Sequence, residues 1–128
     1  GNVGIGTTGP RGILEVGNVS SSGGGMLIKR MDVTSSLTEN TTFFTHPNLN
    51  GEWAGIVEIT ALSSTDVNRH AYILARYAYD NTFTSLLDSS QNSGITLTTS
   101  GDNMQMRIGG TVDLTYRVVI RIMGSDES

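Results

Sequence analysis

Hydrophobic and polar residues alternate through much of the second half of this chain. The alternation is longest over residues 112–123, where Val118, Ile120 and Ile122 would point to one side and Arg117 and Arg121 to the other. A period of two residues is the signature of a β-strand with one buried face. Further strands are expected at 26–31, 56–62, 71–79, 85–88, 95–99 and 104–108, because turn residues separate these segments.

These strands predict an all-β fold, an antiparallel β-sandwich or jelly-roll-like head over residues 26–128. Residues 34–40 are polar and are expected to form a loop. Gly109 and Gly110 stand between two predicted strands, and glycines accept the positive φ that a two-residue hairpin turn requires. The pattern therefore predicts a tight hairpin that joins 104–108 to 112–123.

The first 25 residues have a different pattern. Val3, Ile5 and Thr7 alternate with small or polar residues, and a second short strand is expected at 13–16. Residues 17–25, rich in Ser and Gly, have the composition of a flexible connector. Two short strands cannot bury an apolar face alone, so they must pack on the rest of the chain or on copies of it. We therefore divide the chain into residues 1–25, a glycine-rich stalk segment with a connector, and residues 26–128, the head.

The stalk segment also resembles a known repeat. Residues 1–8 read Gly-Asn-Val-Gly-Ile-Gly-Thr-Thr, Pro10 follows, and Leu14, Glu15 and Val16 complete the pattern. This motif is similar to a repeat of bacteriophage tail fibres and tailspikes, with departures at Gly9 and at residues 11–13. The resemblance is confined to residues 1–16. It implies the C-terminal tip of a longer, homotrimeric fibre protein, located extracellularly on the virion.

Composition excludes several other classes of function. The net charge is −4 and the sequence pI is about 4.9, so nothing indicates nucleic-acid binding. No apolar run approaches the roughly 18 residues of a membrane-spanning helix, and no membrane insertion is predicted. The chain has no cysteine, which excludes thiolate catalysis and thiolate metal sites. We predict no cofactor.

Catalytic and metal-binding patterns are not evident. His46 and His70 are far apart in sequence and are interpreted as ordinary surface or interface histidines, with a metal ion shared by three copies as the alternative. Glycoside cleavage needs two carboxylates that face one cleft, and only Glu52 and Glu58 come into question. We predict that the chain is not an enzyme.

Candidate ligand contacts lie in polar loops and next to an aromatic residue. The predicted ligand-binding residues are Trp53, Arg69, His70, Asp80 and Asn81. For Trp53 the competing interpretation is a core side chain that closes one end of the sandwich. Four arginines, namely Arg76, Arg107, Arg117 and Arg121, fall on strand faces opposite the apolar rows. Such arginines would either be solvated or pair with Glu58 across a subunit boundary.

The function that fits these observations is attachment to a host surface. The homotrimer would bind a host cell-surface glycan or protein at several weak sites together. Two alternatives remain open. The head could be a purely structural cap that holds the trimer in register, or the chain could be a fragment of a polysaccharide-degrading tailspike.

Overall fold

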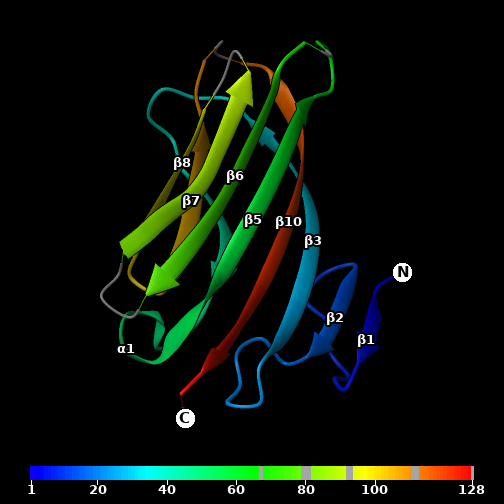
Figure 1. Ribbon diagram of the computed structural model, residues 1–128. Coiled ribbons are helices and arrows are strands. Elements are labelled where there is room, and N and C mark those ends of the chain that lie inside the picture. The colour runs from blue at the N-terminus through cyan, green and yellow to red at the C-terminus, as the bar shows by residue number, and fades with distance from the viewer. Residues whose placement is uncertain (67, 79–81, 92–93, 111–112, 128) are drawn as a thin grey trace.

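A computed structural model describes residues 1–66, 68–78, 82–91, 94–110 and 113–127. Over these residues the chain is all-β, as predicted, apart from one helical turn, α1 (Leu49–Glu52). Two sheets of unequal size pack face to face (Figure 1). As described, the small sheet contains β4 (Thr41–Thr45), β9 (Asn103–Ile108) and β8 (Ile95–Ser100) in that spatial order.

The large sheet contains the remaining strands. Strand β10 lies at its centre, where it pairs antiparallel with both β3 and β5. The spatial order in the described residues is β1 (Val3–Ile5), β2 (Leu14–Gly17), β3 (Gly25–Thr34), β10 (Thr115–Asp126), β5 (Trp53–Ser63), β6 (His70–Ala78) and β7 (Thr82–Gln91).

The predicted alternation of the last strand is confirmed. Val118, Ile120 and Ile122 are fully buried, whereas Arg117, Val119 and Arg121 are exposed. We call the side of the large sheet that faces the small sheet its inner face, and the opposite side its outer face. Because a strand's side chains alternate between faces, each strand contributes one row to the core and one to the outer face.

The predicted hairpin at Gly109 and Gly110 is wrong. Strand β9 belongs to the small sheet and β10 to the large sheet, so the glycines lie in a connection that crosses between the two sheets. The apolar residues of β9 and β10 explain why the two strands lie in different sheets instead of forming a hairpin. Met104, Met106 and Ile108 bury their side chains against the large sheet from the opposite layer, and a local hairpin would have placed both apolar rows in one sheet.

Several strands are longer than predicted. Strand β7 extends over Thr82–Gln91 rather than 85–88, and β3 extends over Gly25–Thr34 rather than 26–31. In both cases mostly polar residues continue the strand, with one apolar residue in each extension, Val33 in β3 and Phe83 in β7. Backbone pairing with a long neighbour, β6 for β7 and β10 for β3, accounts for the extra length, because ladder hydrogen bonds do not depend on side-chain polarity.

Residues 1–25 extend the large sheet. Strand β1 pairs parallel with β2, and β2 pairs antiparallel with β3, so both lie at the sheet edge farthest from β7 (Figure 1). The turn between β2 and β3 is closed by backbone hydrogen bonds, including Asn18 N–H to Gly24 O at 3.2 Å. Val19 in this turn is fully buried. The division at residue 25 stays a prediction, but the two parts share one sheet.

Candidate functional site

The small sheet covers the inner face of the large sheet and leaves its outer face open among the described residues. Near its centre, Arg121 of β10 donates to the Glu58 carboxylate of β5 at 2.8 Å. The Tyr72 hydroxyl of β6 donates to the other Glu58 oxygen at 2.6 Å. Arg121 and Glu58 are direct cross-strand partners, and Tyr72 is diagonal to Glu58. The register of three strands therefore builds this polar network.

The network affects the acidity of the tyrosine. The hydrogen bond to Glu58 raises the pKa of Tyr72, and partial burial and the negative charge of Glu58 act in the same direction. Tyr72 therefore remains a neutral phenol, and the Glu58 carboxylate holds its hydroxyl in place. A fixed aromatic ring beside charged and polar groups is a common element of binding surfaces.

A shallow groove lies beside this network, toward the end of the sheet where β5 turns into β6. Its volume is about 420 Å³. Arg117, His70 and Tyr72 line it together with Thr60, and Leu62 and Val119 supply an apolar floor. Cationic, aromatic and hydroxyl groups over an apolar floor match the chemistry of a saccharide, which has both hydroxyl groups and apolar C–H faces.

The opposite end of the outer face is apolar. One row of cross-strand partners runs Ile5, Val16, Met26, Met123 and Ile56 over five neighbouring strands. Ile5 is 58% exposed, and Met123 and Ile56 are each more than one-third exposed. Contiguous apolar surface of this kind is uncommon on a monomer and marks interaction sites.

The sequence-predicted site residues are not brought together. Trp53 is fully buried, and its indole N–H donates to Val19 O at 2.7 Å, which matches the competing core interpretation. Arg69 and His70 lie at the other end of β5, and Arg69 contacts Asp66 at 3.4 Å. Of these, His70 lines the groove. Asp80 and Asn81 lie outside the described residues. Ligand binding by Arg69 and His70 stays a prediction.

Two residues that line the groove, Tyr72 and Arg117, are not among the ligand-binding residues predicted from the sequence. The sequence predicts only a strand over 71–79 for Tyr72 and an outward strand position for Arg117, because nothing in a single strand shows which neighbour will lie beside it. The sequence predicts outward arginines that are either solvated or paired with Glu58 across a subunit boundary, and the structure instead pairs Glu58 with Arg121 of the same chain. The signal that could have found this pair is the shared outward position on two long alternating strands.

The interpretation of His46 as a surface or interface histidine is wrong. His46 is buried, and its Nε2 lies 2.7 Å from Asp126 Oδ2, which is also buried. Its Nδ1 accepts the Asn48 backbone N–H at 3.1 Å. Because Nδ1 accepts a hydrogen bond, Nε2 carries the proton and donates to the carboxylate. His46 thus fastens the end of β10 to the loop before α1.

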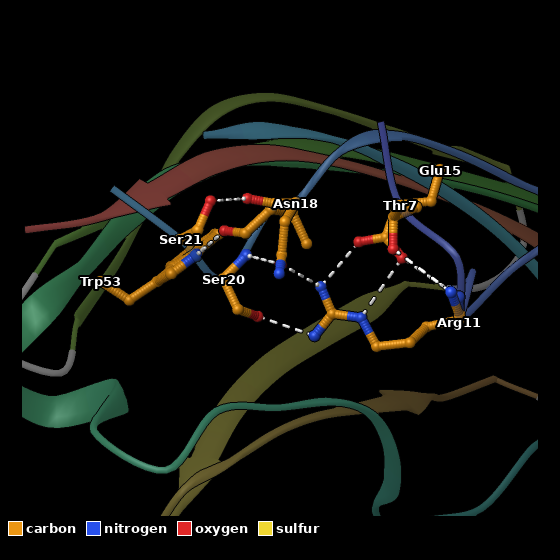
Figure 2. A network of polar contacts seen from close by, with 9 residues as sticks. Thr7, Arg11, Glu15, Asn18, Ser20, Ser21 and Trp53 are labelled. Carbon is orange, nitrogen blue, oxygen red and sulfur yellow. Dashed lines mark hydrogen bonds and ion pairs between the residues drawn. The ribbon is translucent and has the colours of Figure 1, made fainter. Parts of the chain in front are cut away.

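A second polar cluster fixes the N-terminal strands (Figure 2). The Arg11 guanidinium donates to Glu15 Oε2 at 2.7 Å and to Ser20 Oγ at 2.7 Å. The Glu15 side chain is only 2% exposed. Burial alone would raise the pKa of Glu15, but hydrogen bonds and charge from Arg11, with the backbone N–H of Val19, hold this pKa below its usual value. A buried carboxylate is thereby kept ionised.

This cluster predicts a pH-dependent contribution to stability. Because the folded-state pKa of Glu15 is lowered, the contribution is complete above the unfolded value of 4.5 and disappears as the pH falls through the folded value. At pH 7, Glu15→Gln should lower the free energy of unfolding by about 1 kcal/mol, since water screens the partly exposed Arg11. Urea unfolding of both proteins from pH 7 to pH 3 should show the difference shrinking below pH 4.5. Glu39→Gln, in an exposed loop, is the control. A difference that does not depend on pH would contradict the assignment.

The described residues hold no group of three or more histidine and acidic side chains that could bind a metal ion. Among the same residues no helix has the length and hydropathy needed to cross a membrane. Glu52 and Glu58, the carboxylates considered for glycoside cleavage, are six residues apart along α1 and β5. At ~3.3 Å per residue they are separated by roughly 20 Å, beyond the spacing of a catalytic pair.

No family model matches the chain, and no curated protein matches it. Two solved structures are similar in fold. The first is the tailspike protein gp49 of Acinetobacter baumannii bacteriophage Fri1, a capsular polysaccharide depolymerase, with 16% identity and a TM-score of 0.49 over 78% of this chain. The second is the tailspike protein of Acinetobacter phage vB_ApiP_P1, with 11% identity and a TM-score of 0.49, again over 78% of this chain.

The prediction that the chain is not an enzyme is contradicted by the first of these structures, which is itself a depolymerase, and we withdraw it. That prediction considered only the carboxylates of this chain. The chain spans 17% of the length of the first tailspike and 21% of the second.

Proposed function

We propose that the chain is part of a phage tail fibre or tailspike and that it binds a host cell-surface glycan as a homotrimer on the virion. The groove on the outer face carries this proposal. There Arg117, His70 and Tyr72 combine hydrogen-bond donors with an aromatic ring over an apolar floor. The motif of residues 1–16, which resembles the tail-fibre repeat, supports the viral assignment.

The apolar row of the outer face supports assembly. Ile5, Val16 and Met26 continue the row onto the N-terminal strands, so the stalk motif and the head share one uncovered apolar surface. Burial of this surface between copies would contribute about 25 cal/mol per Å² of apolar area removed from water. A purely structural trimer cap would bury the same apolar row between its copies. Only glycan binding in the groove distinguishes a host-binding protein from such a cap.

The test combines ligand binding with a mass measurement. The purified protein is applied to an array of bacterial capsular and lipopolysaccharide glycans, and Arg117→Ala is compared with the parent on every glycan bound. We expect at least about a fivefold loss of affinity for Arg117→Ala, because truncation of a central arginine contact often costs more than about 1 kcal/mol. Light scattering should give three times the 13.6 kDa chain mass for both proteins.

Arg107→Ala is the matched control, since Arg107 lies on β9 of the small sheet and does not line the groove. Equal binding by the parent and Arg117→Ala would remove the groove from the proposal. If the parent binds no glycan but has the trimer mass, the structural cap becomes the better assignment. A monomer mass at micromolar concentration would exclude the homotrimer.

A further inference from the structure

A second pocket lies on the other side of the large sheet, where the inner face of β3 meets the edge of the small sheet. Its volume is about 250 Å³. Arg11 and Lys29 line it with Phe44, Thr42 and Thr45. Strand β4 is the edge strand of the small sheet, so the pocket opens along a strand edge that no described strand of that sheet covers. The groove described above is on the outer face and shares no lining residue with this pocket.

Lys29 is a half-buried cation without an acidic partner among the described residues. Its Nζ donates to Phe43 O at 3.0 Å, and the described ion pairs do not include it. An ammonium group has three N–H donors, so two remain for another acceptor. Burial lowers the pKa of Lys29, and the positive charge of Arg11 lowers it further. The pocket thus disfavours the charge that the lysine carries at neutral pH.

Arg11 is positioned rather than mobile. Glu15, Ser20 and Asn18 accept hydrogen bonds from its guanidinium, and its terminal carbon lies 5.6 Å from the centroid of the Phe44 ring. Glu15 balances the charge of Arg11, whereas no lining residue balances Lys29. With Arg11 balanced by Glu15, the side chains that line the pocket therefore carry one net positive charge.

We propose that this pocket binds one small oxyanion, a carboxylate or sulfate group on a molecule no larger than a single sugar residue. The anion would accept hydrogen bonds from Lys29 Nζ, and the fixed Arg11 guanidinium would add electrostatic attraction. The volume is below that of pockets for drug-sized ligands, which limits the occupant to a small group. Bound negative charge would compensate the half-buried ammonium and stabilise the folded chain.

Lys29 offers a direct readout because it is the only lysine in the sequence. Protein labelled with ¹³Cε-lysine gives one side-chain signal, which is titrated with sodium glucuronate and with sodium sulfate. Glucose and sodium chloride at matched ionic strength are the controls. We expect a saturable shift with an oxyanion and none with the controls, together with a higher titration midpoint for Lys29. Tighter binding of glucuronate than of sulfate would indicate an acidic sugar as the source, and the reverse a free anion.

Lys29→Met separates this role from a structural one. We expect the variant to melt at the same or a higher temperature than the free parent. In isothermal titration calorimetry, which needs no lysine signal, it should bind the oxyanion at least about tenfold more weakly than the parent, because it loses a charge-assisted hydrogen bond. Arg30→Met, with the same charge change on the outer side of β3, should bind as the parent does. The absence of any oxyanion shift in the parent would overturn the proposal. So would undiminished anion binding by Lys29→Met.

Discussion

Ile120→Asp is expected to leave no cooperatively folded protein at 25 °C. Ile120 is fully buried at the centre of β10, where its direct partners are Lys29 of β3 and Ile59 of β5. An aspartate there loses the packing of a large side chain, which costs about 2–5 kcal/mol. It also removes a carboxylate from water, at a further cost of several kcal/mol that pairing with the half-buried Lys29 would offset only in part. The total approaches the whole stability of a domain of this size.

Far-UV circular dichroism during urea unfolding measures the effect, with Val119→Asp as the matched control. Val119 is the next residue, is 40% exposed and points to the outer face. Its substitution should lower the free energy of unfolding by about 1 kcal/mol or less, because surface substitutions are usually mild. If Val119→Asp unfolds the chain as completely as Ile120→Asp does, the outer face is part of an obligate subunit interface rather than an open surface.

Trp53→Ala is expected to lower the free energy of unfolding by about 3–5 kcal/mol, the usual cost of removing a buried aromatic side chain. The indole ring contacts Phe44 and Tyr77 at centroid distances of 5.4 Å and 5.9 Å. It also covers Gly55 and Gly124, where an added Cβ would collide with the ring. Loss of the hydrogen bond to Val19 O would loosen the turn that joins β2 to β3.

Urea unfolding is monitored by circular dichroism rather than by fluorescence. Trp53 is the only tryptophan, so the variant has no tryptophan fluorescence. Trp53→Phe should recover part of the loss, since a phenyl ring fills part of the space but donates no hydrogen bond. Leu37→Ala, at a position 68% exposed, should change stability by less than about 0.5 kcal/mol. A stable Trp53→Ala protein with impaired glycan binding would favour the ligand-binding interpretation of this residue instead.

The sequence alone determined the all-β class and the inward and outward rows of the long strands. The alternation around Ile120 specified which side chains would be buried, because a strand's period of two is a local property of the backbone. The same pattern placed Arg117 and Arg121 on the outer face. Local rules also indicated that residues 1–16 need a partner surface, since two short strands cannot cover an apolar row alone.

Only the tertiary structure decided which strands are neighbours. Gly109 and Gly110 fit a hairpin locally, yet β9 and β10 belong to different sheets because both apolar rows are buried only when the strands lie in opposite layers. The groove of His70, Tyr72 and Arg117 forms because β5 pairs with β6 on one side and with β10 on the other. Its residues come from strands that are distant in sequence, and cross-strand register is a long-range property that a single strand's pattern does not encode.

The same reason applies to the buried charged and polar groups. Nothing near His46 in the sequence indicates that Asp126 will lie 2.7 Å away. Likewise, Lys29 has the polar character of a surface residue and is half-buried only because β4 passes over the inner face of β3. The sequence states which groups can bind or ionise, and the packing of the two sheets decides which of them lose water and which find a partner.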